Sequence, residues 1–254
     1  MMELAAPPAW RCIDFISDLH LAQDTPRTYA AWRDYLLRTD ADAVFILGDL
    51  FEAWIGDDAR LQGFDAQATA VLREAAARRP IAFMVGNRDF LLGAAMLEDC
   101  GIRALDDPCV VCAFDQRVLL THGDAWCLAD VEYQQIRRRV RDPAWQAQAL
   151  AQPIALRRQI AGQLRAQSEL RAADHQGPWA DIDVPTALRA LADARADTLV
   201  HGHTHRPATA ELAPGLTRHV LSDWELDHAT RAEVLRWQDG TWHRLSPAAA
   251  TAAA

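Results

Sequence analysis

Seven side chains with oxygen or nitrogen donor atoms lie in five short blocks, and together they have the composition of a metal site. The blocks read DLH at 18–20, GD at 48–49, GNRD at 86–89, HGD at 122–124 and GHTH at 202–205. Carboxylate, amide and imidazole groups are suitable ligands for Mn, Fe or Zn. Two such ions held side by side clamp a phosphoryl group during in-line displacement, so the blocks predict a dinuclear site for phosphoryl chemistry. The seven candidate ligands are Asp18, His20, Asp49, Asn87, His122, His203 and His205.

Each block closely follows a short apolar run that is rich in β-branched residues. The runs cover residues 13–16, 43–47, 81–85, 118–120 and 198–200. Continuous apolar runs of this length predict buried parallel strands, whose carboxyl ends form the ligand-binding edge of an α/β sheet. We therefore expect five strand ends to converge on one edge and to carry the ligands there.

The spacing within two of the blocks adds a geometric expectation. In an extended segment, residues two apart point to the same face, so Asp18 and His20 would share one face, as would His203 and His205. An isolated block is weak evidence, because a lone Asp is more often a helix cap and a lone His an ordinary polar residue. Five blocks in one strand-then-turn context favour the metal site.

Length and composition restrict the class of protein. The 254 residues, 50% of them hydrophobic, suffice for one sizeable core with an inserted subdomain. The net charge of −9 argues against nucleic-acid binding. No apolar run reaches the ~20 residues that span a bilayer, and the N-terminus lacks the pattern of a signal peptide, so we expect a cytoplasmic protein. The five cysteines include one C-x-x-C inside a predicted strand, which favours buried thiols over a zinc site.

The remaining periodicity predicts an α/β fold of two packed mixed sheets flanked by helices. Helical spacing predicts helices over residues 28–37, 64–78, 94–98 (ended by the glycine at 101) and 185–194. We expect a hairpin of 109–114 and 117–121 that turns at Asp115 and Gln116. Closing antiparallel strands are expected over residues 209–212, 219–221 and 232–237.

The motifs D-x-H, GD, GN-x-D/E, H-G and G-H-x-H, in this order, resemble those of the calcineurin-like metallophosphoesterases. The longer strings FISDLHL, ILGDLFEAWIGDD, VGNRDFLLG, THGD and HGHTHRP are similar to the UDP-2,3-diacylglucosamine pyrophosphohydrolase branch. The resemblance extends from about Ile13 to Pro207, with a weaker tail at 219–237. Arg88, where many phosphatases carry a His, and the extended second block at 51–58 distinguish this branch. The resemblance implies an α/β/β/α sandwich with a helical cap insertion.

The resemblance also implies an activity and its cofactors. Members of this branch cleave UDP-2,3-diacylglucosamine, a lipid-linked nucleotide sugar, to UMP and 2,3-diacylglucosamine 1-phosphate (lipid X) in lipid A biosynthesis. Two Mn²⁺ ions per subunit, or other divalent metals, would activate water for attack on the α-phosphorus. The resemblance assigns one ion to Asp18, His20, Asp49 and His205. It assigns the other to Asp49, Asn87, His122 and His203, with Asp49 bridging.

Site roles follow from the same resemblance. Asn87, Arg88 and His122 are the implied catalytic residues, and with His203 they also contact substrate. Arg88 would hold a phosphoryl oxygen in the transition state; the alternative is a structural salt bridge with the adjacent Asp89. His201, just outside the last block, is expected to support the ligands rather than to bind metal.

Residues 129–179 do not fit the alternation of strands and helices. Apolar positions at helical spacing predict two or three inserted helices. These helices could form a cap that offers an apolar channel to acyl chains, or their basic residues could simply form a solvated face. Because the insert begins at the edge of the sheet that carries the ligands, we favour the cap. The expected division is a core of 1–128 and 180–246, a cap of 129–179 and a flexible tail of 247–254.

Within the cap, Asp130, Tyr133 and Ser168 match substrate-contacting positions of the family. The match then fails, because Ala172 stands where the family has an Asn, and the sequence contains no Lys to supply the family's next contact. Arg171 or His175 could substitute for these contacts.

A diacylated substrate implies weak peripheral association with the inner membrane surface, and we expect a monomer. Two other functions stay open. One is a different dinuclear-metal phosphoesterase, such as a phosphatase or cyclic-nucleotide phosphodiesterase. The other is a non-catalytic scaffold, which the complete set of candidate ligands disfavours.

Overall fold

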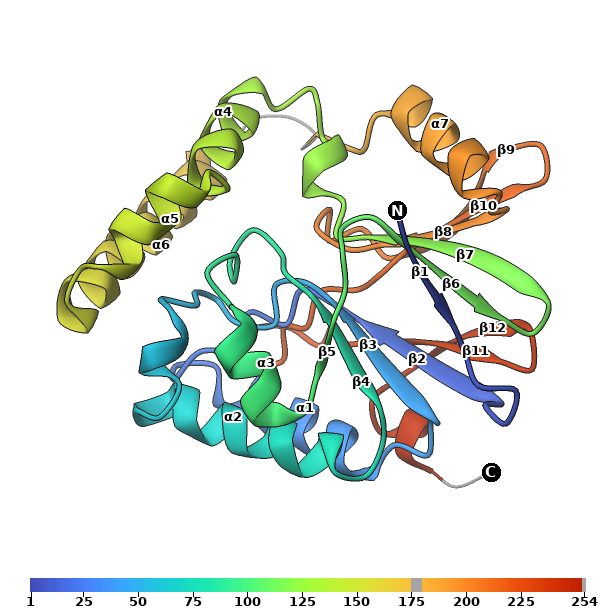
Figure 1. Cartoon of the computed structure of the whole chain (residues 1–254), viewed down its shortest axis with the longest axis horizontal. Helices are drawn as coiled ribbons and strands as arrows, with labels where there is room; N and C mark the ends of the chain where they lie inside the picture. The colour runs from blue at the N-terminus through green and yellow to red at the C-terminus, as the bar shows by residue number, and fades with distance from the viewer. Residues whose placement is uncertain (175–179, 253–254) are drawn as a thin grey trace.

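Two six-stranded sheets pack face to face between layers of helices in the computed structural model (Figure 1). The structure describes residues 1–174 and 180–252, and for 167–174 it describes the backbone alone. The expected α/β sandwich of two mixed sheets is confirmed.

The first sheet carries the N-terminal ligand blocks. Its strands are, in spatial order, β12 (Thr241–Leu245), β11 (Val234–Gln238), β2 (Cys12–Ile16), β3 (Ala43–Leu47), β4 (Ile81–Met84) and β5 (Arg103–Ala104). Strands β2 to β5 are parallel, and β11 joins β2 in antiparallel register. The outer face is covered by α1 (Pro26–Arg38), α2 (Gly63–Ala76) and α3 (Ala94–Cys100) (Figure 1). Because both faces are covered, every residue of β2, β3 and β4 is buried, as their apolar runs predict.

The second sheet carries the two C-terminal ligand blocks. Its spatial order is β1 (Met2–Ala5), β6 (Cys109–Ala113), β7 (Gln116–Thr121), β8 (Thr198–His201), β10 (Leu216–Val220) and β9 (Ala208–Ala213). Helix α7 (Val184–Ala194) covers its outer face, and side chains of both sheets form the shared core between them. The five cysteines are free thiols, four of them buried.

Two expectations about the fold need correction. The five ligand-bearing strand ends belong to two sheets, with β2, β3 and β4 in one and β7 and β8 in the other, because the sandwich brings two sheet edges together. The hairpin turns at Phe114 and Asp115, both at positive φ, since Ala113 pairs with Gln116. The expected antiparallel closing strands are confirmed, since β10 pairs with β9 and β11 with β2 in antiparallel register, while β10 also pairs with β8 in parallel.

The C-terminal segment contacts the core within residues 247–252, the described part of the predicted flexible tail. Residues 249–251 form a short 3₁₀ helix, in which Ala250 is buried. Arg236 donates to the Ala250 carbonyl at 2.9 Å and to both oxygens of the buried Asp14. A buried guanidinium that uses this carbonyl therefore holds the tail against the core.

The insert forms three helices that extend from the sandwich beyond the carboxyl ends of the strands (Figure 1). They are α4 (Val131–Val140), α5 (Pro143–Leu150) and α6 (Ile154–Asp174). The buried Arg157 of α6 pairs with Asp58, at 2.8 Å from Nη1 to Oδ1, and Arg141 after α4 donates to the Gly86 carbonyl at 2.8 Å. These contacts fix the insert to the loops that follow β3 and β4. No described helix is long and apolar enough to cross a membrane.

The buried pair of Asp14 and Arg236 yields a stability prediction. Asp14 also accepts from Tyr35 and Thr39 at 3.0 and 2.9 Å. Asp14→Ala therefore removes the acceptor of both hydroxyls and the buried carboxylate partner of Arg236, which among the described residues keeps only Asp40 as an ion-pair partner. Removing one partner of such a pair costs about 3–5 kcal/mol. We expect urea unfolding to show a loss of this size, whereas Asp34→Asn, which alters an exposed pair with Arg33, leaves the midpoint unchanged.

Candidate dinuclear metal centre

The structure brings the seven candidate ligands together in two groups at the meeting point of the two sheets. Asp18, His20 and His205 form the first group, and Asp49, His122 and His203 form the second; within each group the ligand atoms lie within 4.8 Å of one another. Asn87 joins the second group, because its Oδ1 lies 2.9 Å from His122 Nε2 and 2.8 Å from His203 Nδ1.

The groups are adjacent through their backbones. The amide of His203, in the second group, donates to Asp18 Oδ2 at 2.9 Å. The Asp49 carbonyl accepts from the amides of Leu19 and His20 at 2.9 and 3.1 Å. Backbone hydrogen bonds thus connect the loops of the two groups, as expected for a centre that binds two ions side by side.

Five of the seven candidate ligands have a backbone φ between 49° and 65°, namely Asp18, His20, Asp49, His203 and His205. The expectation of extended D-x-H and H-x-H segments was therefore wrong. His203 and His205 do not share a face but belong to different groups, as the family resemblance implies. Left-handed conformations cost free energy in residues other than glycine, and their concentration here is typical of a functional site.

Gly86 allows the second group to form. A Cβ atom at this position would lie 2.1 Å from Asp49 Oδ1 and 2.5 Å from its backbone nitrogen. Since real Cβ contacts are far longer, only glycine lets the two loops approach this closely.

Gly86→Ala is therefore expected to displace Asp49 and to lower both metal content and turnover. Gly162→Ala is the matched control, because no atom lies within 4 Å of a Cβ there and the residue is helical. The control should bind metal normally and gain up to about 1 kcal/mol of stability. Metal analysis and thermal unfolding of both variants test this, and full metal content in Gly86→Ala would contradict it.

The electrostatics of the centre favour a cation. Burial alone would lower the pKa of His122, but the carboxylates of Asp49, Asp18 and Asp124 raise it to about 9. Burial raises the pKa of Asp89 to about 6, with Asp49 adding to the rise. Asp18 Oδ1 is buried without a hydrogen bond of good geometry, although His205 Nε2 lies 3.3 Å away. An unsatisfied carboxylate oxygen that faces imidazole nitrogens fits a divalent metal ion.

Arg88 lies beside the centre but does not pair with its neighbour in sequence. Asp89 instead accepts from the amides of Leu50 and Gly86 at 2.8 and 2.7 Å, which supports the ligand loops. Arg88 Nη1 lies 3.3 Å from Glu52 Oε1, and its backbone amide donates to Asp49 Oδ1 at 2.7 Å. The alternative of an Arg88–Asp89 salt bridge is therefore wrong.

Asp130 and Tyr133, the two predicted substrate contacts whose side chains are described, have different roles in the structure. Asp130 accepts from the Tyr133 amide at 2.9 Å and so acts as the N-cap of α4. Tyr133 reaches the centre: its ring lies 5.6 Å from that of His203, and its hydroxyl donates to Asp124 at 2.6 Å. The side chains of Ser168 and Arg171 are not described, and His175 lies outside the described residues.

Two buried residues lie beside the ligands: Asp124, to which the sequence analysis assigned no role, and His201, which was expected to support the ligands. Asp124 is buried and accepts from Tyr133 and from Arg137 at 2.7 Å, which attaches α4 to the centre. Positions 133 and 137 are four apart, so helical spacing could have placed both side chains on one face. His201 is buried beside the ligands, with Arg218 donating to its Nε2 at 2.8 Å, and belongs to neither group.

The fold and these two ligand groups define a class, the metal-dependent phosphoesterases built on two packed mixed sheets. Residues 13–207 match the calcineurin-like phosphoesterase family, and the chain belongs to that family. More specifically, it belongs with the proteins called UDP-2,3-diacylglucosamine hydrolase, as the motifs predict.

Three relatives support this placement. The protein of that name from Chromobacterium violaceum is 46% identical over 238 residues, which cover 90% of this chain and 95% of that protein. The one from Stenotrophomonas maltophilia is 42% identical over 240 residues, covering 90% and 95%. The one from Xanthomonas campestris pv. campestris is 46% identical over 223 residues, covering 83% and 90%.

Proposed function

We propose that this protein hydrolyses the pyrophosphate bond of UDP-2,3-diacylglucosamine at the α-phosphorus, giving UMP and 2,3-diacylglucosamine 1-phosphate in lipid A biosynthesis. The observation that carries the proposal is the pair of adjacent ligand groups beside a helical cap, in a chain 46% identical to a UDP-2,3-diacylglucosamine hydrolase. The proposed units are a core of 1–128 and 180–246 and a cap of 129–179, acting as a monomer.

The proposed cofactors are two Mn²⁺ ions. Asp18, His20 and His205 would hold one ion; Asn87, His122 and His203 would hold the other, and Asp49 would bridge them. When bound, the ions would supply an activated water nucleophile and neutralise charge on the phosphoryl oxygens. Mixed oxygen and nitrogen donors suit Mn²⁺ without excluding other divalent metals.

The chain's own side chains would orient the substrate. Arg88 lies one residue after Asn87 and is 29% exposed, so its guanidinium is accessible to a phosphoryl oxygen. Arginine presents forked donors that match phosphate geometry. The Tyr133 ring lies 5.6 Å from that of His203, tilted by 34°, and would shape the wall that faces the sugar. Asp130 is a less direct candidate for substrate contact, because it caps its helix.

The cap has an apolar surface that would suit acyl chains. Neither α4 nor α5 has a fully buried residue. Large apolar side chains that are 40–60% exposed occur in this insert and just before it, at Leu128, Val131, Ile136, Leu150, Leu156, Ile160 and Leu164. We propose that this surface receives the acyl chains and contacts the cytoplasmic face of the inner membrane.

Vesicle flotation tests the membrane part of this proposal. Vesicles containing anionic lipid are expected to carry a fraction of the protein, and Val131→Ser with Leu164→Ser is expected to reduce that fraction, because less apolar area enters the interface. Val184→Ser is the matched control, because it removes an exposed apolar side chain on α7, outside the cap. This variant should float like the wild type. Protein that stays wholly in solution would contradict membrane contact.

Turnover of defined substrates tests the reaction. Chelated protein is reloaded separately with Mn²⁺, Mg²⁺ or Zn²⁺ and assayed with UDP-2,3-diacylglucosamine, a generic phosphomonoester and a cyclic nucleotide. Release of UMP from the first substrate at a far higher kcat/KM supports the proposal. Preference for either of the others would establish a different phosphoesterase, and metal-loaded protein without any turnover would indicate a scaffold.

A further inference from the structure

The two imidazoles of the first metal group are oriented alike. Their Nε2 atoms lie 3.3 Å apart, and His205 Nε2 also lies 3.3 Å from Asp18 Oδ1. Both Nδ1 atoms face carboxylates on the other side: His20 Nδ1 lies 3.1 Å from Glu52 Oε2, and His205 Nδ1 lies 4.0 Å from Asp223 Oδ2. Each ring thus lies between an inner ligand position and an outer carboxylate.

The second group is supported differently. His122 Nδ1 lies 2.8 Å from the carbonyl oxygen of Leu47, while its Nε2 lies 2.9 Å from Asn87 Oδ1. A carbonyl only accepts, so His122 carries its proton on Nδ1 when neutral. Among the described residues, a neutral carbonyl group therefore lies behind His122, whereas a carboxylate lies behind each imidazole of the first group.

Glu52 is held in place by groups other than His20. Its side chain is 15% exposed and lies 3.3 Å from Arg88 Nη1 and 4.0 Å from Arg165 Nε of the cap. His20 Nδ1 is buried 3.1 Å from Glu52 Oε2 without a hydrogen bond of good geometry, so a small rotation of the ring is needed for the carboxylate to accept its proton. A proton on Nδ1 leaves the Nε2 lone pair for a metal.

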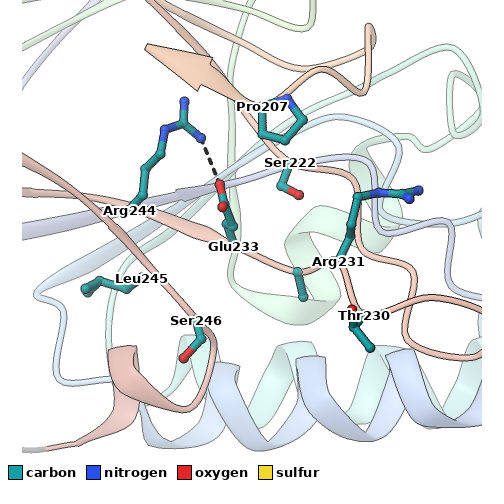
Figure 2. A pocket seen from close by; sticks show the side chains of 9 residues that line it. Pro207, Ser222, Thr230, Arg231, Glu233, Arg244, Leu245 and Ser246 are labelled. Atoms are coloured by element: carbon teal, nitrogen blue, oxygen red, sulfur yellow. Dashed lines mark hydrogen bonds and ion pairs between the residues drawn. The ribbon is translucent and has the colours of Figure 1, made fainter.

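Asp223 is fixed by Arg231. Arg231 Nε donates to Oδ1 at 3.0 Å and Nη2 to Oδ2 at 2.5 Å, and Asp223 is buried. Arg231 lines a cavity of about 240 Å³, where its side chain points away from the Arg244–Glu233 pair (Figure 2). The guanidinium is thus engaged with Asp223 and keeps this carboxylate in position behind His205.

We infer that Glu52 and Asp223 are positioning residues for one metal site only, holding His20 and His205 as the tautomer that presents Nε2 to the ion. The inference rests on the proposed function, because it requires that the two ligand groups bind ions. Carboxylates behind a ligating imidazole fix its orientation and increase its basicity, and their loss weakens metal binding about 10–100-fold.

Metal titration of the full chain tests this inference. Metal-free wild type, Glu52→Gln, Asp223→Asn and Asp99→Asn are titrated with Mn²⁺ by calorimetry, and bound Mn is counted after desalting from graded EDTA. We expect one of the two ions to bind about 10–100-fold more weakly in Glu52→Gln, with a smaller effect in Asp223→Asn because its contact is longer. Asp99, which pairs with Arg60 and Arg73 and touches no ligand, should titrate like wild type after substitution.

Glu52→Asp, which keeps the charge, should recover part of the lost affinity, whereas a merely structural role would not distinguish it from Gln. Equal weakening of both ions, or no change in either variant, overturns the inference. If Glu52→Gln does not fold, as judged by thermal unfolding of the metal-free form, Asp223→Asn decides alone. If the wild type binds two ions and both variants titrate like it, the inference is wrong but the proposed function stands. If the wild type binds fewer than two ions, the result contradicts both the inference and the proposed function.

Discussion

Asp49→Ala is expected to abolish hydrolysis and to remove bound metal. Asp49 is 1% exposed, and its carboxylate lies between a backbone donor and an imidazole: Oδ1 accepts from the Arg88 amide at 2.7 Å, and Oδ2 lies 3.7 Å from His122 Nε2. Its carbonyl accepts from the loop that carries His20. Because both proposed ions share this carboxylate, its loss removes one ligand from each, and UMP release should fall to the uncatalysed background.

Two companion variants separate metal loss from misfolding. Asp49→Asn keeps an oxygen for the Arg88 amide but lacks the bridging charge, so it should fold normally and still be inactive. Asp42→Asn serves as the control, since Asp42 also accepts backbone amides, those of Arg11 and Cys12 at the opposite end of β2, and should leave activity intact. Two bound ions together with wild-type turnover in Asp49→Ala would show that this carboxylate is not shared.

The ligand-bearing strands were predictable because they are short, apolar and buried on both faces. Residues 13–16 and 43–47 are apolar except for Asp14, whose charge is paired with Arg236 inside the protein, so their pattern indicates parallel strands inside an α/β fold. The helices between them were predictable for the same reason, from a periodicity that is local in sequence. Edge strands were missed: Met2–Ala5 and Thr241–Leu245 lie at the sheet margins, where partial exposure removes the apolar signal.

Assignment of strands to sheets was not predictable from local pattern. The register of β7 against β8 and of β2 against β3 depends on contacts between distant segments, so five similar runs could equally have formed one sheet. The positive φ angles at Asp18 and His203 are likewise imposed by tertiary contacts, since no sequence rule requires them. Family resemblance, not spacing, separated His203 from His205.

The support around the ligands was the least predictable part of the site. Glu52 lies 32 positions after His20 in sequence, and Asp223 follows His205 by 18, so no short motif joins either pair. Each is an ordinary acidic residue until the fold places it behind an imidazole. The role of such residues depends on their place in the folded structure, which a short sequence pattern does not encode.

Arg88→Ala is expected to lower turnover about 10²–10³-fold, the usual effect of removing one donor to a charge that develops in the transition state. Both metal ions should remain bound, because the Arg88 side chain is not a ligand and its backbone amide, which holds Asp49, survives the substitution. The measurements are kcat and KM with UDP-2,3-diacylglucosamine, together with Mn content. Arg88→Lys should recover only part of the rate, since an ammonium group lacks the forked donors of a guanidinium.

Arg78→Ala is the control for loss of a cation, because Arg78 is half exposed and forms an ion pair with Glu74 on α2. Its kcat should equal that of wild type. A higher KM with unchanged kcat in Arg88→Ala would assign the guanidinium to ground-state binding, since only interactions that strengthen in the transition state raise kcat. Loss of one ion from Arg88→Ala would instead assign the effect to Glu52, which loses its 3.3 Å partner and with it part of its hold on His20.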